Sequence, residues 1–323
     1  MVAPLVDIYL TADHADRSLR QDARRGLTST PKWLPPKWFY DARGSDLFEE
    51  ITRLPEYYPT RAERSILRER AGDIARRTGA HTLVELGSGS SEKTRLLLDA
   101  LRAEGTLREY VPLDVSETAL RDAVAAVHQD YPMLSIHGVV GDFTEHLDRI
   151  PGQTPRMVAF LGGTIGNLFP DERAIFLREL RATLVPDEWL LLGADLVKDP
   201  TVLVTAYDDA AGVTADFNRN VLAVLNRELD ADFDVENYEH VAIWDPDNEW
   251  VEMRLRSNST AQVTLAELAL DIALETGEEI RTEISAKFRK EGIERELAAA
   301  GFALDSWWTD SEGRFALCLA RAR

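Results

Sequence analysis

The sequence predicts an α/β fold: a doubly wound sheet with an antiparallel closing hairpin, plus a smaller α+β domain. Nearly continuous apolar runs alternate with amphipathic helical stretches from residue 61 to 198. This alternation is typical of a parallel sheet covered by helices on both faces. It stops after Asp199 and gives way to polar helices and paired strand-like runs. Residues 287–323 then return to one helix followed by a hairpin, which is expected to complete the sheet.

The segment before the alternation is expected to be an ordered loop with short helices. One amphipathic helix is predicted near "DRSLRQDARRGL", and five prolines from residue 31 to residue 59 exclude a long helix or a central strand after it. Thr60 and Glu63 have the spacing of a capping box. This pair predicts a helix that begins there and ends near Thr78.

Five apolar runs are expected to form the parallel strands: "TLVEL", "YVPLD", "IHGVVGDF", "MVAFLGGT" and "WLLLGADLV". Beyond them the sequence predicts two helices, a hairpin of "HVAIW" and "EWVEMRLRS" around the turn "DPDN", and a second strand pair within "ALDIALETGEEIRTEISAKF". Two domains follow. One comprises residues 61–198 and 287–323, and the other comprises residues 1–60 and 199–286.

The composition narrows the classes of partner. The 323 residues carry 37 Lys and Arg against 56 Asp and Glu, a formal net charge of -19, which repels nucleic acid and anionic membranes. Neither an export leader nor an apolar run of membrane-spanning length is recognisable, and the single Cys318 excludes an intramolecular disulfide. The six histidines never fall at metal-ligand spacing. We expect a cytoplasmic, monomeric protein that binds no metal, no nucleic acid and no membrane.

The glycine turn "VELGSGSSEKT" is the first candidate for a binding site. It nearly spells a phosphate-binding P-loop, but Glu92 stands where the last glycine would let backbone N–H groups wrap the phosphate. A dinucleotide fingerprint fits poorly as well, because its third glycine is also replaced by Glu92. The remaining interpretation is a nucleoside cofactor without phosphates, S-adenosylmethionine.

Acidic residues at the ends of consecutive strands favour that cofactor. Glu85 ends the first strand before the glycines, and Asp114 ends the second, where a carboxylate can accept both ribose hydroxyls. Asp142 and Phe143 follow the third, where an adenine amine and ring would be held. Any one acid could equally be a helix cap. The ordered set favours cofactor binding in the class I methyltransferase form of the Rossmann-like sheet.

Long and unusual motifs outside this turn carry a resemblance to a known family. They are "LPPKWFYDARGSDLFEEITRLPEYYPTR", "GGTIGNLFP", "AYDDAAGVTADFNRNVLAVLNREL" and "EISAKF". Together with the glycine turn they resemble, in order and over essentially the whole chain, the L-histidine Nα-methyltransferases of ergothioneine biosynthesis. The resemblance implies trimethylation of the histidine α-amine to hercynine, with three S-adenosylmethionine molecules. The two blocks outside the Rossmann-like region, residues 1–60 and 199–286, are expected to cover the carboxyl edge of the sheet as a substrate-binding domain or lid.

The same resemblance implies the site residues. The expected cofactor contacts are Gly87, Lys93, Asp114, Asp142 and Phe143. The expected histidine contacts are Tyr57, Asn167, Tyr207, Glu283 and Ser285, with Tyr40 near the amine. Lys93, which looked like a phosphate-binding lysine, becomes a partner for the methionine carboxylate of the cofactor.

The chemistry suits these residue types. A carboxylate such as Glu283 can accept a hydrogen bond from a neutral or a cationic imidazole. Ser285, two residues further along a strand, points to the same face. Tyr40 and Asn167 are the expected catalytic residues: the phenol or a water it holds takes the amine proton, and the amide orients the nitrogen. Loss of the proton to solvent is an alternative route.

Two other functions are compatible with the sequence. One is a methyltransferase for a different small amine or for a protein side chain. The other is a sensor that binds S-adenosylmethionine without turnover.

Overall fold

A computed structural model describes residues 3–323, which divide into two compact units. Unit 1 contains the chain up to Leu10, Pro59–Val197 and Lys287–Arg323, and unit 2 contains Thr11–Tyr58 and Lys198–Ala286. The sequence predicts that residues 1–60 belong as a whole to the second domain. That assignment is wrong for the first strand, because β1 (Leu5–Ile8) pairs in parallel with β5 in the sheet of unit 1.

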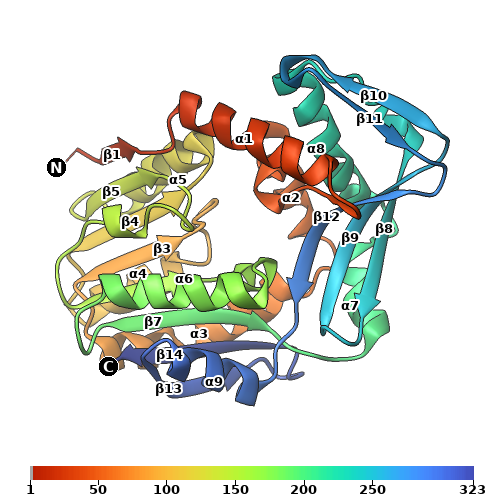
Figure 1. The fold of residues 1–323 in the computed structure, drawn as a ribbon. Coiled ribbons are helices and arrows are strands. Elements are labelled where there is room, and N and C mark those ends of the chain that lie inside the picture. The colour runs from red at the N-terminus through yellow and green to blue at the C-terminus, as the bar shows by residue number, and fades with distance from the viewer. Residues whose placement is uncertain (1–2) are drawn as a thin grey trace. The chain divides into compact units, whose positions relative to one another are not determined.

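Unit 1 is built on an eight-stranded sheet (Figure 1). Its strands lie in the order β1-β5-β4-β3-β6-β7-β14-β13, and all are parallel except β14, which is antiparallel to both its neighbours, β7 and β13. The predicted parallel sheet with an antiparallel closing hairpin is therefore confirmed. Besides β1, the strands are β3 (Thr82–Leu86), β4 (Glu109–Asp114), β5 (Ser135–Val140), β6 (Arg156–Phe160), β7 (Trp189–Asp195), β13 (Phe302–Thr309) and β14 (Phe315–Ala322).

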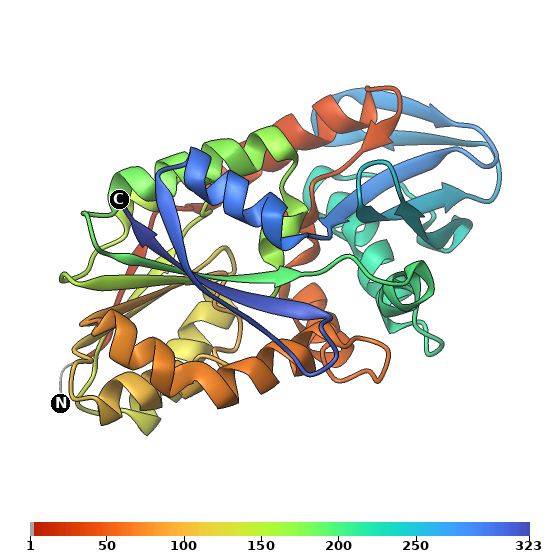
Figure 2. The ribbon, with the colours of Figure 1, turned by 90° about the horizontal axis from the view of Figure 1, so that it is seen from below.

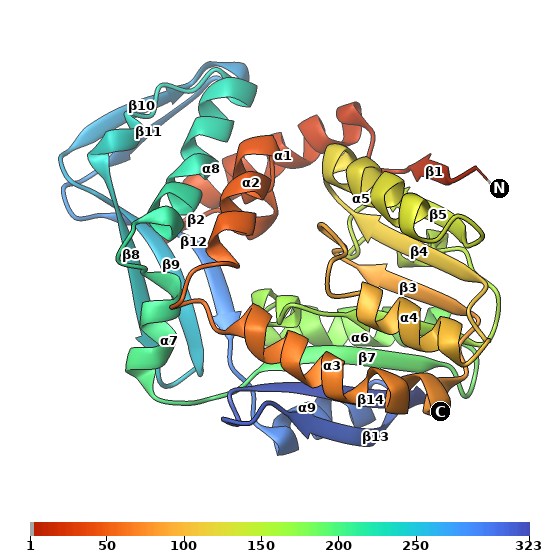
Figure 3. The same ribbon diagram turned by 180° about the vertical axis from the view of Figure 1, so that it is seen from behind.

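Helices cover this sheet on both faces, as Figure 2 shows with the sheet nearly on edge. One face carries α3 (Pro59–Thr78), α4 (Arg95–Ala103) and α5 (Glu117–Asp130), which lie in front of the sheet in Figure 3. The other face carries α6 (Pro170–Thr183) and α9 (Lys290–Ala299). Because both faces are covered, every residue of β3 and β7 is buried, which explains the continuous apolar runs. Short 3-10 helices complete unit 1: η2 (Leu147–Arg149) and η3 (Thr164–Asn167).

The cysteine lies inside this core. Cys318 of β14 is fully buried, and its thiol donates to the carbonyl of Leu192 at 3.3 Å. Burial raises the pKa of the thiol to about 12. A thiol in this state is a poor nucleophile.

The start of α3 differs from the prediction. The helix begins at Pro59, a residue whose fixed φ suits the first helical position. Glu63 does not close a capping box with Thr60, because its side chain is fully buried and binds Gly162 and Lys93 instead. The spacing was right for a cap, but the helix turns this carboxylate toward the sheet.

Unit 2 combines helices with two small sheets. Its four-stranded sheet has the order β2-β12-β9-β8, and a separate hairpin pairs β10 with β11. The helices are α1 (Ala12–Leu27), η1 (Pro36–Phe39), α2 (Ala42–Ile51), α7 (Pro200–Tyr207), α8 (Val213–Leu229), η4 (Val235–Asn237) and η5 (Ala266–Leu268). The strands are β2 (Lys32–Trp33), β8 (Tyr238–Asp245), β9 (Trp250–Ser257), β10 (Ala261–Leu265), β11 (Leu270–Leu274) and β12 (Glu279–Ala286).

The predicted hairpin of β8 and β9 is confirmed, whereas the predicted pairing of β11 with β12 is wrong. Strand β11 pairs with β10, whose alternating "AQVTL" places Val263 opposite Ile272 on a buried face. Strand β12 pairs with β9 instead, and hydrogen bonds between Ser257 and the turn at Gly277–Glu278 start that ladder.

Two features are absent from residues 3–323. No helix there combines the length and the apolar character that a membrane span requires. No group of three or more His, Cys, Asp or Glu side chains is placed to hold a metal ion.

Candidate functional site

The glycine turn follows β3 at the carboxyl edge of the unit 1 sheet. Gly87 and Gly89 have φ values of 67° and 47°, a region that glycine adopts without a steric penalty. The amides of Gly87 and Ser88 donate to the carbonyl of Leu113 at 2.8 and 3.1 Å. Apart from the chain neighbours of each glycine, no atom of residues 3–323 lies within 4 Å of a Cβ built on Gly87 or Gly89. The turn is therefore fastened to β4 while its outer side leaves room for a ligand.

Asp114 ends β4 beside this turn. One oxygen accepts from the amide of Gly89 and the other from the amide of Ser116, both at 2.9 Å. Burial raises the pKa of Asp114, and those two hydrogen bonds oppose the rise. A carboxylate has about four lone-pair sites, so each oxygen can accept one more hydrogen bond. These are the acceptor positions that the two hydroxyls of a ribose need.

Asp142 and Phe143 follow β5 at the same edge. The Asp142 carboxylate accepts from the amide and the hydroxyl of Thr144, at 2.8 and 2.6 Å. The Phe143 ring is half-buried and meets Phe160 edge-on, with ring centroids 5.0 Å apart. The loop thus presents one carboxylate held by its own backbone and one aromatic ring held by the core.

Strand β1 adds a residue that the sequence analysis missed. Tyr9 follows this strand, and its amide donates to the carbonyl of Val140 at 2.9 Å. Its ring stacks on His146 at 6.1 Å, and His146 Nδ1 accepts from the amide of Asp142 at 3.1 Å. Tyr9 therefore supports the loop after β5. No motif pointed to it, because only the pairing of β1 with β5 brings it there.

Lys93 lies on the glycine turn but does not stand alone. Its ammonium group forms an ion pair with Glu63 of α3, whose carboxylate also accepts from the amide of Gly162 at 2.8 and 3.1 Å. The Lys93 side chain is 23% exposed and that of Glu63 is 0% exposed. Glu63 is the second residue that sequence reasoning missed. The signal was a carboxylate on the apolar face of α3, next to Ala62 and Ile66.

Asn167 is the last residue of η3, directly after β6. Two glycines open this turn, since Gly162 and Gly163 have φ values of 77° and 73°. The hydroxyl of Thr164 donates back to the carbonyl of Leu161 at 3.0 Å and closes it. In a doubly wound sheet, ligands bind at the carboxyl ends of the strands. Asn167 lies at that edge with the cofactor candidates.

Unit 2 holds the other predicted residues. The hydroxyls of Tyr207 and Ser285 lie 2.7 Å apart and are buried. Ser285 and Glu283 share one face of β12, because they lie opposite Val251 and Met253 of β9. A β-bulge between Arg281 and Glu283 decides this face. Its extra residue turns the following side chains to the side of α7.

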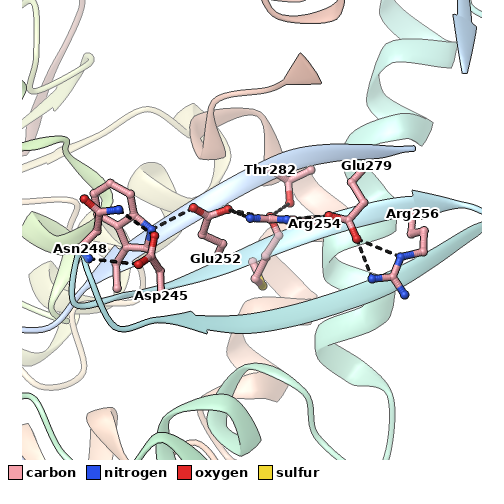
Figure 4. A network of polar contacts seen from close by, with 9 residues as sticks. Asp245, Asn248, Glu252, Arg254, Arg256, Glu279 and Thr282 are labelled. Atoms are coloured by element: carbon pink, nitrogen blue, oxygen red, sulfur yellow. Dashed lines mark hydrogen bonds and ion pairs between the residues drawn. The ribbon is translucent and has the colours of Figure 1, made fainter. Parts of the chain in front are cut away.

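The opposite face of the same strands carries an ion ladder, which Figure 4 shows from close by. Arg254 donates to Glu252 at 2.8 Å and to Glu279 at 2.7 Å, and Arg256 donates to Glu279 at 2.6 Å. Without the bulge, Glu283 would point to this ladder. The bulge therefore places Glu283, an expected histidine contact, on the face opposite Arg254 and Arg256.

The three candidate tyrosines of unit 2 are linked through an aromatic cluster. Tyr40 meets Phe48 and Phe217 edge-on, with centroids 5.6 Å apart in both pairs. Phe48 meets Tyr57 at 6.2 Å, and Tyr57 meets Tyr207 at 6.3 Å. Edge-to-face contacts fix ring orientation. The cluster holds rings that are separate in the sequence in one continuous arrangement.

A chain of buried hydrogen bonds holds the backbone carbonyl of Tyr207. His240 accepts at Nδ1 from the amide of Asn218 and donates from Nε2 to the carbonyl of Tyr207, both at 2.8 Å. Thr282 donates to the other end of the Asn218 amide at 2.6 Å. Burial lowers the pKa of His240 and favours the neutral ring. His240 is thus an interior residue whose two ring nitrogens both have hydrogen-bond partners.

The structure places the predicted residues in two groups. The group in unit 1 is Gly87, Lys93, Asp114, Asp142, Phe143 and Asn167. The group in unit 2 is Tyr40, Tyr57, Tyr207, Glu283 and Ser285.

Comparison with known proteins gives a consistent result. A family model described as histidine-specific methyltransferase, SAM-dependent, matches residues 19–322. The chain is 58% identical to the histidine N-alpha-methyltransferase of Mycolicibacterium smegmatis and 54% identical to that of Mycobacterium tuberculosis, in each case over 97% of both chains. It is also 32% identical to ergothioneine biosynthesis protein 1 of Neurospora crassa, over 86% of this chain and 32% of that one.

Proposed function

The chain belongs to the family of histidine-specific, S-adenosylmethionine-dependent methyltransferases, and on that basis we propose that it methylates the α-amino nitrogen of L-histidine. Three successive transfers give hercynine, the trimethylated product, for ergothioneine biosynthesis. The observation that carries the proposal is the 58% identity to a histidine N-alpha-methyltransferase over nearly the full length of both chains. The similarity to an ergothioneine biosynthesis protein supports the pathway.

The carboxyl edge of the unit 1 sheet is our proposed site for the methyl donor. S-adenosylmethionine supplies an electrophilic methyl group on a sulfonium. Asp114 would accept the ribose hydroxyls through the lone pairs that its two amide partners leave over. Asp142 would accept the adenine amine beside the ring of Phe143. The open space at Gly87 and the ammonium group of Lys93 would receive the methionine part.

The polar groups of unit 2 are our proposed contacts for histidine. Glu283 and Ser285, on one face of β12, would hold the two imidazole nitrogens. Tyr57 and Tyr207 would donate to the carboxylate as neutral hydroxyls. Tyr207 can do so while it accepts from Ser285, because a phenol both donates and accepts.

The protein's main contribution to the rate would be alignment. Methyl transfer is an in-line displacement, and correct positioning of two reactants can contribute ~7–11 kcal/mol. Asn167 would orient the amine lone pair without adding charge. The proton leaves either through Tyr40, directly or by a water that it holds, or to solvent. A Tyr40→Phe variant distinguishes these routes, since only the first predicts a loss of kcat at neutral pH.

Mass spectrometry of L-histidine incubated with the protein and S-adenosylmethionine tests the activity. We expect mono-, di- and trimethylhistidine in succession. No methylated product, with the donor still bound, favours a sensor. Calorimetric titration of histidine, tryptophan, arginine and lysine in the presence of S-adenosylhomocysteine tests the acceptor. Binding of another amine but not of histidine would favour a methyltransferase for a different small amine or for a protein side chain.

Crossed variants test the two groups of residues. Glu283→Ala is expected to weaken histidine binding far more than cofactor binding, and Asp114→Ala to do the reverse. Glu239→Ala removes an exposed carboxylate from β8 of the same unit 2 sheet and serves as the control. Equal loss of both affinities in Glu283→Ala contradicts its specificity role. An unchanged cofactor affinity in Asp114→Ala contradicts the ribose assignment.

Displacement from a sulfonium needs no metal, so we propose that none takes part. Activity should survive exhaustive chelation, and restoration by an added divalent cation would refute this. We further propose that the protein works as a cytoplasmic monomer without nucleic-acid or membrane partners, which its charge of -19 supports. Light scattering that gives twice the mass of 36.2 kDa would overturn the monomer.

A further inference from the structure

Glu63 is a buried carboxylate that joins two turns of unit 1. Its side chain is 0% exposed on α3. It forms an ion pair with Lys93 on the turn after β3, and it accepts from the amide of Gly162 on the turn after β6 at 2.8 and 3.1 Å. These partners lie 30 and 99 residues away in the sequence. One side chain thus ties together two turns at the carboxyl edge of the sheet.

The strand below leaves space for this carboxylate. A Cβ added to Gly193 of β7 would lie 2.2 Å from Glu63 Oε1, which is far inside van der Waals contact. The backbone of Gly193 does not have a positive φ, so the space and not the conformation requires glycine there. The site is therefore built around Glu63 from three elements.

The ion pair also sets the charge at this edge. A buried carboxylate is costly unless it is paired, so Glu63 and Lys93 neutralise each other. A lone ammonium group would repel the sulfonium of S-adenosylmethionine, which lies three carbons from the methionine carboxylate. S-adenosylhomocysteine has a neutral thioether at the same place. The two ligands therefore differ by one positive charge beside the proposed position of Lys93.

We propose that Glu63 is a positioning residue for the methyl donor: it fixes Lys93 and cancels its charge, so that the site accepts the sulfonium form. The inference rests on the proposed cofactor contact of Lys93. Glu63 itself need not touch the ligand. It acts through Lys93 and through the turn at Gly162.

The test is the pair of dissociation constants for S-adenosylmethionine and S-adenosylhomocysteine in matched variants. Glu63→Gln keeps the shape and can still accept from Gly162, but it leaves the charge of Lys93 uncancelled. We expect its dissociation constant for S-adenosylmethionine to rise about tenfold more than that for S-adenosylhomocysteine, as one screened charge at short range allows. Lys93→Met leaves the opposite charge and should shift the ratio the other way. The double variant should return the ratio toward that of the wild type.

Three further variants make the test complete. Gly193→Ala changes no functional group, yet it should displace the carboxylate and shift the ratio in the direction of Glu63→Gln. Glu69→Gln on the exposed side of α3 should leave both constants unchanged. Thermal unfolding shows which variants fold. If the variants at Glu63 do not fold, Lys93→Met alone still shows in which direction the charge of Lys93 shifts the ratio of the two dissociation constants.

Equal changes for both ligands would show a merely structural role and overturn the proposal. So would a shift of the same sign in Glu63→Gln and Lys93→Met. Asp114→Ala separates this failure from failure of the proposed function. If it weakens both ligands while Glu63→Gln does not alter their ratio, the cofactor site stands and the role of Glu63 is wrong. If the wild type binds neither ligand, the proposed function itself fails.

Discussion

Replacing Glu85 with glutamine is expected to stabilise the protein at high pH and to have little effect at low pH. Glu85 lies at 4% exposure in β3, below the glycine turn, and accepts from the hydroxyls of Thr94 and Tyr110. Burial raises the pKa of Glu85 from 4.5 to about 7, against the opposing effect of these hydrogen bonds. A carboxyl group with a raised pKa stabilises the fold fully below its unfolded pKa. That stabilisation is lost as the pH rises through 7.

The size of the effect follows from the gap between the two pKa values. A gap of about 2.5 pKa units at roughly 1.4 kcal/mol each corresponds to about 3–4 kcal/mol. Glutamine keeps the shape and carries no charge. Its oxygen can accept from Thr94, and its NH₂ can donate to Tyr110, which can in turn donate to Ser91 at 2.8 Å. The oxygen and the nitrogen of the glutamine side chain thus each keep one hydrogen-bond partner.

Urea unfolding of both proteins from pH 4.5 to 9 measures this effect. The difference in free energy of unfolding between variant and wild type should rise across the range by about 3 kcal/mol. Glu92→Gln, on a side chain 59% exposed in the same turn, controls for the loss of one charge. A difference that stays constant with pH would refute the reasoning, as would a variant less stable than the wild type at pH 9.

Three more predictions concern stability and cofactor affinity. Burial lowers the pKa of His240, so the unfolded chain takes up the proton first as the pH falls. The free energy of unfolding should therefore decrease as the pH drops below about 6.5. In urea titrations, His240→Gln should make this decrease with pH less steep. Gly44→Ala places a Cβ 1.6 Å from a backbone carbonyl oxygen and should lower the free energy of unfolding by about 1–3 kcal/mol or more. Gly72→Ala in α3 meets only a flexible side chain at 3.5 Å and should raise the free energy of unfolding by about 0.5–1 kcal/mol. If both variants shift the denaturant midpoint in the same direction, this contrast is wrong. Tyr9→Ala removes the ring stacked on His146 and should weaken the binding of S-adenosylhomocysteine several-fold, without changing the affinity for histidine. Calorimetry measures both affinities, and an unchanged dissociation constant for S-adenosylhomocysteine would show that the ring is dispensable.

Much of the fold was predictable because its signals are local. The apolar runs of β3 to β7 reflect burial on both faces, and the closing hairpin follows from the turn "SEGR" between two apolar strands. Glu92, which stands where the phosphate-binding motifs require glycine, excludes those motifs on the sequence alone. The order of the acids at the strand ends favoured a nucleoside cofactor, and the long motifs indicated the histidine-methylating family.

The tertiary structure alone decided which distant residues share an environment. Glu63 has the spacing of a helix cap, yet it lies against Gly162 and Gly193 because α3 packs on the sheet with that face inward. Strand β1 joins unit 1 because it pairs with β5 at the edge of the sheet. The bulge in β12 turns Glu283 away from the arginine ladder. The periodicity of a segment indicates how that segment is buried. The partner of a buried charge or of an edge strand lies about a hundred residues or more away in the sequence, and only packing brings the two together.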